Sequence, residues 1–344
     1  MGVKLHHYLV KYADEAAMMN AAAEAPPNSK PLRRFGVALE VASDVVAASD
    51  PSRKVRFISS YRRTLTLGPA ARRRLRLEQD LHRAVENTEL TLYYQPQFEV
   101  QSGVAHGVEA LARWFRFDGT IVEPCVFIPL AEETHLIGAL GSWVLEEACK
   151  TLQEWRTGAM DSPTLGVNVS THQLDETLAA IVRGTLERTG FPAKRLELEI
   201  TEGALVGDAA VIIDCFRQLK EIGVRIAIDD FGTGYSSLSY LSRLPVDRLK
   251  LDKSLIHNLS LHWKDAAIVR SVVALGKELG VAVIAEGVET EQQFQMLKQL
   301  GCQQVQGYLF ARPAPQNVAN ALMARRWGLR KTAPAQVIGA TRGG

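Results

Sequence analysis

The sequence predicts an α/β fold in which short strands and longer helices alternate and close into a β/α barrel. From residue 90 onward, apolar runs of strand length alternate with stretches of helical periodicity, a pattern typical of parallel strands joined by helices. Gly223, Gly280 and Gly301 each follow a helical stretch, where a left-handed cap is expected. An open doubly wound sheet would need a glycine-rich phosphate turn after an early strand, and the sequence has none there.

The expected strands are short and mostly apolar, as buried parallel strands are. They lie at residues 90–95, 104–111, 165–169, 196–200, 225–228, 248–251, 282–285 and 304–306. The clearest helices between them lie at residues 137–155, 176–189, 209–222, 266–279 and 291–300. Because these units fill residues 90–325, we predict one barrel domain there.

Three segments lie outside the predicted barrel. Residues 1–66 are rich in Ala and show no catalytic constellation, so we expect a small helical or irregular N-terminal segment. Residues 67–89 are charged, with Leu75, Leu77 and Leu81 roughly on one side of a helix, which predicts an amphipathic linker helix. Residues 326–344 are expected to form a flexible C-terminal tail.

Composition argues against several classes of protein. The chain has 344 residues, a net charge of +2 and no long basic run, which gives no reason to expect nucleic-acid binding. Its four cysteines form no C-x-x-C pair, which argues against a zinc site or a disulfide framework. No apolar run reaches the roughly 18 residues of a membrane helix. We therefore expect a cytoplasmic chain without a membrane segment, although a longer parent protein could be tethered to a membrane.

Polar residues recur at the ends of the predicted strands. They are Glu109, Asn168, Glu199, Asp229, Asp230, Lys250, Glu286 and Gln306. In a β/α barrel the carboxyl ends of the parallel strands meet at one mouth, where catalytic residues gather. A single carboxylate near a strand end is usually a helix cap or a solvated loop residue, but the coincidence across so many strands indicates one functional site.

The residue types at this mouth predict a metal centre. Carboxylates and one amide, without a thiolate or a dominant His, suit hard cations such as Mg²⁺ or Mn²⁺. The adjacent pair Asp229 and Asp230 could serve two metal ions roughly 4 Å apart, the arrangement used for phosphoryl displacement. Glu197 is expected to point away from the pocket. Glu202 and Glu289 are expected to cap or hydrogen-bond adjoining loops.

The motifs identify a family resemblance across residues 81–325. In chain order they are Tyr94-Gln95-Pro96, Glu109-Ala110-Leu111-Ala112-Arg113-Trp114, Phe127-Ile128-Pro129-Leu130-Ala131-Glu132, Asn168-Val169-Ser170, Glu199-Ile200-Thr201-Glu202, the run from Asp229 to Leu238, Lys250-Leu251-Asp252, Glu286-Gly287-Val288-Glu289 and Gln306-Gly307-Tyr308. They closely resemble those of the EAL phosphodiesterase family in order and spacing. The resemblance implies a modified TIM-type barrel whose first strand runs antiparallel to the others. It also implies hydrolysis of cyclic di-GMP to linear pGpG with two Mg²⁺ or Mn²⁺ ions per active site.

The resemblance further implies roles for individual residues. First-metal ligands would be Glu109, Asn168, Glu199 and Asp229, with Asp229 bridging to a second metal ion beside Asp230 and Glu286. Catalytic residues would be Lys250, Glu286 and Glu109, and substrate contacts would be Gln95, Arg113, Asp252 and Gln306. Lys250 would position or activate the attacking water, either with a lowered pKa or by a purely electrostatic role.

A mobile loop at residues 230–238 is also implied. Its regulatory residues would be Glu202, Phe231, Gly232, Thr233, Gly234 and Glu289, with Glu202 as its anchor. The resemblance implies a homodimer formed beside this loop and leaves room for upstream sensory domains. At residues 12–18 the chain resembles the end of a GGDEF domain, which suggests either a degenerate GGDEF remnant or an unrelated helical cap. A non-catalytic cyclic di-GMP receptor is the alternative function, and a purely structural or partner-binding module is a third.

Overall fold

The computed structural model describes residues 69–86, 89–155, 163–206, 209–232, 241, 243–259, 262–324 and 326–327. The predicted N-terminal segment, and with it the GGDEF remnant, lies outside the described residues, as does the chain beyond residue 327. By its internal contacts the chain divides into two units, Met1–Arg76 and Leu77–Gly344. The barrel lies wholly in the second unit.

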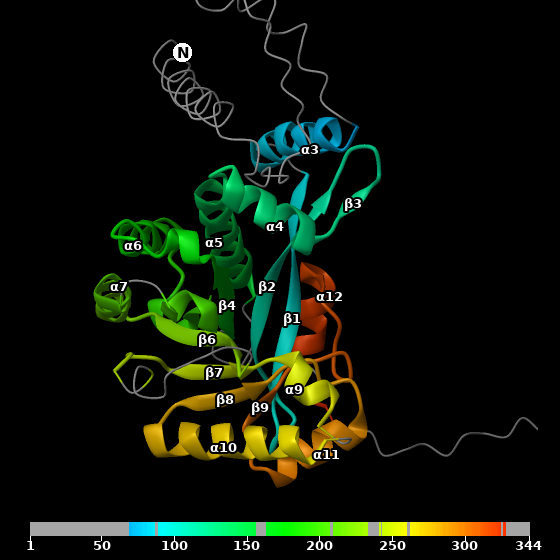
Figure 1. Ribbon diagram of the computed structural model, residues 1–344, viewed down its shortest axis with the longest axis vertical. Coiled ribbons are helices and arrows are strands. Elements are labelled where there is room, and N and C mark those ends of the chain that lie inside the picture. The colour runs from blue at the N-terminus through cyan, green and yellow to red at the C-terminus, as the bar shows by residue number, and fades with distance from the viewer. Residues whose placement is uncertain are drawn as a thin grey trace, which may run out of the picture. The chain divides into compact units, whose positions relative to one another are not determined.

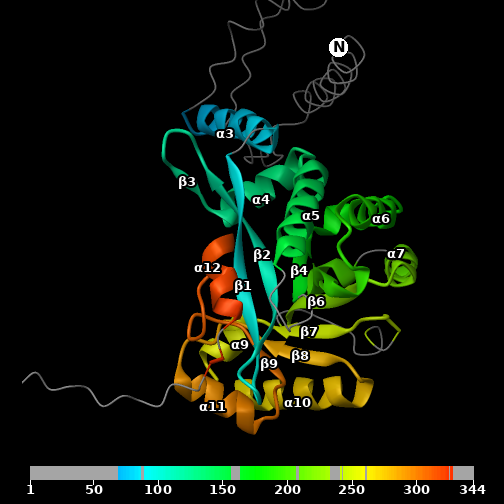
Figure 2. The ribbon, with the colours of Figure 1, turned by 180° about the vertical axis from the view of Figure 1, so that it is seen from behind.

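Eight strands form a closed barrel, which confirms the predicted fold (Figures 1 and 2). The barrel strands are β1 (Leu90–Glu99), β2 (Ala105–Phe115), β4 (Thr164–Val169), β5 (Leu196–Thr201), β6 (Arg225–Phe231), β7 (Arg248–Leu251), β8 (Ala282–Ala285) and β9 (Gln304–Val305). β1 pairs with both β2 and β9 and so closes the ring. It runs antiparallel to both, whereas the remaining barrel strands pair in parallel. The antiparallel first strand is therefore present as expected.

β1 continues past Pro96, although the predicted strand ended at residue 95. On one side β1 pairs with β2 along almost its whole length, with a register shift between Gln97 and Phe98, and Pro96 lies opposite Val108. On its other side, β10 (Ala314–Pro315) pairs with Tyr93 and Tyr94, and β9 pairs only with Phe98 and Glu99. Pro96 lies between these two short pairings, where a strand needs no N–H donor. The proline therefore does not end the strand.

Helices alternate with the strands along the chain, and most of them lie outside the barrel (Figure 1). They are α3 (Pro69–Glu86), α4 (Pro124–Glu133), α5 (Ile137–Glu154), α6 (Leu178–Thr189), α7 (Ala209–Ile222), α9 (Lys253–His257), α10 (Trp263–Leu279), α11 (Glu291–Gln299) and α12 (Gln316–Met323). A two-residue strand, β3 (Ile121–Val122), extends β2 as a hairpin. All five predicted barrel helices are present, and α7 begins and ends at the predicted residues.

The expected helix ends are confirmed by the backbone. Gly223, Gly280 and Gly301 have φ angles of 95°, 70° and 82°, a left-handed conformation that ends a helix. At its other end, α11 begins with a capping box, in which Thr290 and Gln293 each accept a backbone N–H of the other. These local signals position the helices, and burial of their apolar faces against the barrel supplies most of their stability.

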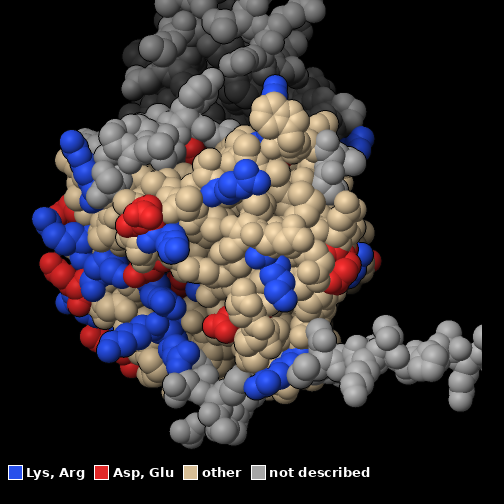
Figure 3. All heavy atoms as spheres, turned by 90° about the horizontal axis from the view of Figure 1, so that it is seen from below, with Lys and Arg blue, Asp and Glu red and all other residues tan. Residues whose placement is uncertain are grey.

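The face of the molecule seen from below carries charges of both signs (Figure 3). On the face seen in Figure 3, Lys and Arg side chains are interspersed with Asp and Glu, and large areas carry neither. Within the described residues, no helix is both long enough and apolar enough to span a membrane.

Candidate functional site

Strand register brings the predicted polar residues to one face. Glu109 on β2 lies opposite Gly166 on β4, and Asn168 on β4 lies opposite Glu199 on β5. Residues two apart on a strand share a face, so Gly166 and Asn168 point to the same side. The register therefore places Glu109, Asn168 and Glu199 together inside the barrel.

Lys250 lies at the centre of this group. Its side chain is buried, and its Nζ lies 2.5 Å from Glu199 Oε2 and 2.7 Å from Glu286 Oε1. Asp229 Oδ1 is 3.2 Å from the same ammonium, and Glu109 Oε2 is 3.8 Å from it. The carboxylates come from four different strands or strand ends, so the closed barrel is what assembles the cluster.

Glu109 is held from two sides by amides. Asn168 Nδ2 donates to Glu109 Oε1, and Gln306 Nε2 donates to Glu109 Oε2, both at 2.6 Å. Gln306 Nε2 also donates to Gln95 Oε1 at 3.1 Å. Because a carboxylate that accepts such bonds is stabilised in its charged form, these contacts hold Glu109 as an acceptor.

The Glu199 carboxylate occupies space that is free because residue 166, on the neighbouring strand, is a glycine. A Cβ atom added at Gly166 would lie 2.2 Å from Glu199 Oε1, so a side chain there would displace the carboxylate. Glu199 Oε1 is buried and accepts no hydrogen bond within the described part of the chain. A buried oxygen of this kind is costly unless it is paired with a donor or a cation.

The charges of the cluster shift its pKa values in opposite directions. Burial lowers the pKa of Lys250, but the charges of Glu109, Glu199, Glu286 and Asp229 outweigh it and raise that pKa well above its usual value. Burial, with repulsion among the carboxylates, raises the pKa of Glu199 well above its usual value and that of Glu286 to about 8. Burial also acts to raise the pKa of Glu109, but the Lys250 charge and the two amide hydrogen bonds lower it overall. These carboxylates therefore favour the charged form of Lys250, and the lowered pKa considered for a lysine beside bound metal ions stays a prediction.

β6 ends in a strained backbone beside the cluster. Asp230 has a φ angle of 54°, a left-handed conformation that residues other than glycine rarely adopt. Gly232 has a φ angle of 99°, and its N–H donates to the buried Glu202 Oε2 at 2.8 Å. Burial and the nearby charges of Asp229 and Asp252 raise the pKa of Asp230. The remaining residues predicted for this loop, Thr233 and Gly234, lie outside the described residues.

The predicted substrate residues are placed differently from one another. Gln95 and Gln306 are buried within the hydrogen-bonded group around Glu109. The Arg113 guanidinium lies 5.6 Å from the ring centre of Tyr93, and its Nη1 donates to the Ala112 carbonyl oxygen. This carbonyl accepts one N–H group of a guanidinium that has five.

Two further predicted residues lie beside the first turns of helices. Asp252 caps α9, because its Oδ1 accepts the Ser254 backbone N–H at 2.9 Å. Glu289 is exposed, and its backbone N–H donates to Gln293 Oε1 in the capping region of α11. Only Asp252 caps a helix with its side chain, because the Glu289 contact involves its backbone alone. The role expected for the Glu289 side chain and the substrate role of Asp252 stay predictions.

The prediction that Glu197 points away from the pocket is wrong. Residues two apart on a strand share a face, so Glu197 lies on the same side as Glu199, one layer deeper. It is buried and forms an ion pair with Arg248, whose Nη1 lies 2.8 Å from Glu197 Oε1. Arg248 Nη1 also donates to Gln97 Oε1 at 3.1 Å. We call this group, with His106 and Arg225 nearby, the barrel floor.

Gln97 and Arg248 were not singled out from the sequence. Gln97 lies two residues after Gln95, and Arg248 lies two residues before Lys250. The same period of two that places Gln95 and Lys250 inside the barrel also places these residues there. That alternation is the signal that could have found them.

The donor set fits a divalent cation in chemistry. The group consists of carboxylate and amide oxygens, which Mg²⁺ and Mn²⁺ prefer, and it includes the unpartnered Glu199 Oε1. Within the described residues, no group of three or more His, Cys, Asp or Glu side chains is arranged as a metal site. The Lys250 ammonium instead provides the positive charge between the carboxylates.

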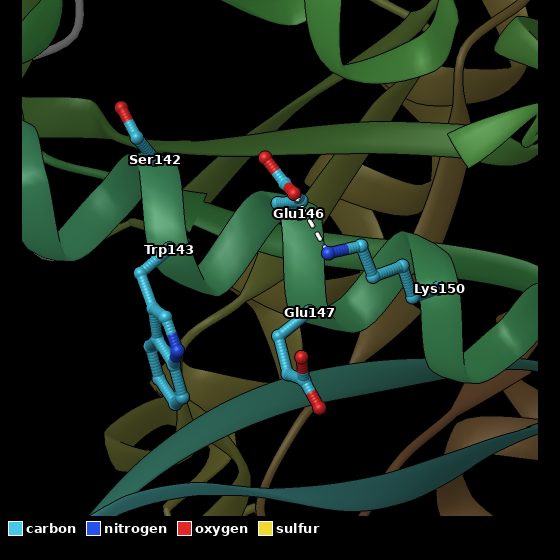
Figure 4. Close-up of a pocket in the computed structure, with 5 residues that line it drawn as sticks. All are labelled: Ser142, Trp143, Glu146, Glu147 and Lys150. Atoms are coloured by element: carbon cyan, nitrogen blue, oxygen red, sulfur yellow. Dashed lines mark ion pairs between the residues drawn. The ribbon is translucent and has the colours of Figure 1, made fainter. Parts of the chain in front are cut away.

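A hollow of about 250 Å³ lies elsewhere, along α5 (Figure 4). It is lined by Ser142, Trp143, Glu146, Glu147 and Lys150. Two of its charged groups form an ion pair, because Glu146 pairs with Lys150 at 2.7 Å, and Glu146 also pairs with Arg188 of α6 at 2.8 Å. All five lining residues come from one outer helix, so this hollow is separate from the carboxylate cluster inside the barrel.

Comparison with known proteins relates the whole barrel to one family. The family model described as the EAL domain matches residues 78–313. The bifunctional diguanylate cyclase/cyclic di-GMP phosphodiesterase MucR of Pseudomonas aeruginosa is 44% identical over 246 residues, which cover 71% of this chain and 36% of MucR. The cyclic di-GMP phosphodiesterase NbdA of the same species is 41% identical over 246 residues, covering 71% of this chain and 31% of NbdA. The chain thus spans about a third of the length of these relatives.

The barrel also matches solved structures of related proteins. A c-di-GMP complex of the phosphodiesterase PaMucR matches with a TM-score of 0.68 and 43% identity, over 71% of this chain and 99% of that one. The EAL domain of Mycobacterium smegmatis DcpA matches with a TM-score of 0.59 and 35% identity, over 70% of this chain and 98% of that one.

Proposed function

The chain belongs to the EAL domain family, and on this basis we propose that it hydrolyses cyclic di-GMP to linear pGpG with the help of divalent cations. The observation that carries the proposal is the cluster of buried carboxylates around Lys250 inside the barrel. Two relatives above 40% identity are named as cyclic di-GMP phosphodiesterases, and the matching structure of PaMucR holds c-di-GMP. We further propose that the chain acts in the cytoplasm.

We assign two Mg²⁺ or Mn²⁺ ions to the carboxylates of this cluster. The first-ion ligands would be Glu109, Asn168, Glu199 and Asp229, and the second-ion ligands would be Asp229, Asp230 and Glu286. Asn168 turns its Nδ2 toward Glu109, so its amide must rotate to present an oxygen instead. When bound, such ions neutralise charge on the phosphate and make the attacking water more acidic.

The chain's own residues would orient the water and the substrate. Lys250 Nζ and Glu286 Oε1 lie 2.7 Å apart, so one water molecule can contact both, and we assign them its orientation. The Arg113 guanidinium is planar and carries N–H groups beyond the one used by the Ala112 carbonyl, which suits a phosphate. Gln95, Gln306 and Asp252 would line the pocket around the substrate.

We also propose that the loop beginning at Asp230 couples metal binding to dimer formation. Glu202 holds the start of this loop through the Gly232 N–H, and Asp230 is both a loop residue and a proposed metal ligand. A second chain that packs beside residues 230–238 would then favour the ordered loop and so favour metal binding.

A product assay tests the proposal. The purified chain is incubated with cyclic di-GMP in Mg²⁺, in Mn²⁺, in Ca²⁺ and in excess chelator, and pGpG is followed by chromatography. We expect turnover with Mg²⁺ or Mn²⁺, little with Ca²⁺ and none with chelator, because Ca²⁺ takes a looser coordination geometry. Full turnover in chelator would exclude the metal mechanism.

The same samples decide the alternative of a non-catalytic receptor. A receptor would bind cyclic di-GMP in a calorimetric titration and leave it intact under every metal condition. Binding without cleavage in Mg²⁺ and Mn²⁺ would therefore replace the phosphodiesterase proposal with the receptor.

A further inference from the structure

An unbroken series of buried hydrogen bonds connects the barrel floor to Glu109. Arg248 Nη1 donates to Gln97 Oε1 at 3.1 Å, and Gln97 Nε2 donates to Gln306 Oε1 at 3.0 Å. Gln306 Nε2 then donates to Glu109 Oε2 at 2.6 Å. Arg248, Gln97 and Gln306 are 2%, 1% and 4% exposed, so water has little access to replace any of these bonds.

All hydrogen bonds in the series run from donor to acceptor in the same direction, because one end is a pure donor and the other a pure acceptor. A guanidinium only donates hydrogen bonds, and an ionised carboxylate only accepts them. Arg248 therefore requires the oxygen of Gln97 to face it, which leaves the Gln97 NH₂ group to face Gln306. The oxygen of Gln306 is engaged in turn, so its NH₂ group must face Glu109.

The opposite orientation of Gln306 would be unfavourable at each contact. Its Oε1 would then face Glu109 Oε2 and Gln95 Oε1, three acceptors without a donor. Gln95 has no freedom to compensate, because its own Nε2 donates to the Ala311 carbonyl oxygen at 3.1 Å. Unpaired polar atoms in a buried position cost free energy, so one arrangement of the three amides is strongly preferred.

We propose that Arg248 and Gln97 are positioning residues that orient Gln306 and, through it, hold Glu109 in the geometry that the active site requires. This inference rests on the proposed function, in which Glu109 is a metal ligand. Glu197 supports Arg248, since their ion pair at 2.8 Å places the guanidinium on the floor. Residues that orient a metal ligand commonly contribute 10–100-fold to metal affinity or activity.

Two residues of β7 affect Glu109, one by direct charge contact and one through hydrogen bonds. Lys250 Nζ faces Glu109 Oε2 directly at 3.8 Å, while Arg248, two residues earlier on the same face, reaches the same oxygen through two amides. Both routes converge on Oε2, and Asn168 holds Oε1. Glu109 is thereby restrained at both oxygens.

The test replaces the central amide. Gln97→Glu keeps the size of the side chain and still accepts from Arg248, but its carboxylate cannot donate to Gln306 Oε1. Gln97→Met removes both bonds, which keeps the test decisive if the buried carboxylate prevents folding. We expect the Mg²⁺ dissociation constant, measured by calorimetry, to rise about tenfold in each variant. We also expect the side-chain amide resonances of Gln306 to shift in NMR spectra recorded without metal.

Gln293 offers a matched control. It is likewise a buried glutamine, 4% exposed, and its Nε2 donates to the Ile256 carbonyl oxygen at 3.2 Å, outside the series. Gln293→Met should lower the thermal stability of the chain but leave the Mg²⁺ dissociation constant and the Gln306 resonances unchanged. A merely structural role for Gln97 predicts that its variants behave like this control.

The possible outcomes separate the two proposals. Unchanged Gln306 resonances in a folded Gln97 variant, or a Mg²⁺ dissociation constant within twofold of the original, would overturn the positioning role. If the unsubstituted chain neither binds Mg²⁺ or Mn²⁺ nor cleaves cyclic di-GMP, the proposed function fails and the positioning role toward a metal ligand fails with it. The NMR measurement still reports in that case whether Gln97 orients Gln306.

Discussion

The inside of the barrel contains two charged regions that differ in their balance of charge. At the mouth, the Lys250 ammonium lies within 3.8 Å of carboxylates from four residues. At the floor, Arg248 pairs with one carboxylate, Glu197, at 2.8 Å. The floor, which also includes Arg225, therefore has no excess of negative groups, whereas the mouth has more negative than positive groups.

This difference in charge balance indicates a different role for each region. A buried ion pair with matched charges adds little net stability but is costly to break by removing one partner. A group of carboxylates with too few counter-ions is unfavourable unless protons or cations bind to it. The floor thus has the features of a structural element, and the mouth has those of a binding site for further positive charge.

The largest expected effect comes from removing one carboxylate of the mouth. Glu109→Ala should lower kcat by more than the ~100-fold that supporting residues of a metal ligand contribute, because it removes a proposed ligand outright. The fold should persist, since Glu109 is not part of the hydrophobic core, which circular dichroism would verify. Activity within tenfold of the original chain would exclude Glu109 as a metal ligand.

The second prediction contrasts the two cations directly. In chelator, Lys250→Met and Arg248→Met should each lower the free energy of unfolding by about 3–5 kcal/mol, because each leaves buried carboxylates without their partner. Denaturant titration measures both. Adding Mg²⁺ should stabilise Lys250→Met more than it stabilises the original chain, since the cation substitutes for the missing ammonium.

Arg248→Met should show no such additional gain. Its unpaired carboxylate, Glu197, is not among the proposed metal ligands. An equal gain in both variants would mean that the two regions do not differ in the way their charges indicate. Turnover gives a second comparison, because Lys250→Met should lose rate more than affinity for the substrate.

The third prediction concerns pH and the floor. Burial, with the charges of Arg248 and Arg225, lowers the pKa of His106 from 6.5 to about 3. Between these values the unfolded chain binds a proton that the native chain does not, so stability falls as pH decreases from about 6.5 to 3. The expected slope is about 1.4 kcal/mol per pH unit from this residue alone.

His106→Gln isolates that contribution. The variant should lose part of the pH dependence, so the difference in unfolding free energy between it and the original chain should shrink as pH falls from about 6.5. Denaturant titrations at a series of pH values measure the difference. A difference that stays constant with pH would contradict a neutral buried His106.

The smallest expected effect is at the start of the loop. Glu202→Ala removes the acceptor of the Gly232 N–H, which should lower stability by about 1–3 kcal/mol and weaken Mg²⁺ binding through the loop. Glu202→Gln keeps an acceptor and should stay close to the original chain. A folded Glu202→Ala variant with an unchanged Mg²⁺ requirement would show that Glu202 supports the backbone only.

Much of the fold follows from local sequence. β7 and β8 begin and end at the predicted residues, because short apolar runs between polar or glycine residues have few other local solutions. The helix ends at Gly223 and Gly280 were predicted for a similar reason, since a left-handed cap needs no contact from elsewhere in the chain. The residues of the mouth were identified because each lies within or directly after a short apolar run.

The floor was not foreseen, and the extension of β1 past Pro96 was not either. Arg248 and Glu197 look in the sequence like charged residues at the solvent-exposed start of a strand, and their burial comes from the closing of the ring by β1. Whether Pro96 ends a strand depends on which neighbours need its N–H, and β9 and β10 both stop short of it.

The chemical types of the residues that gather around Lys250, and their places along the strands, could thus be predicted from the order of residues alone, since both depend on periodicity and on side-chain chemistry. The partners of those residues could not. That Lys250 lies among four carboxylates, that Gly166 leaves room for Glu199, and that Arg248 reaches Glu109 through two amides all depend on strand register and barrel closure. These bring together side chains far apart in the chain, and no local pattern encodes the distances between them.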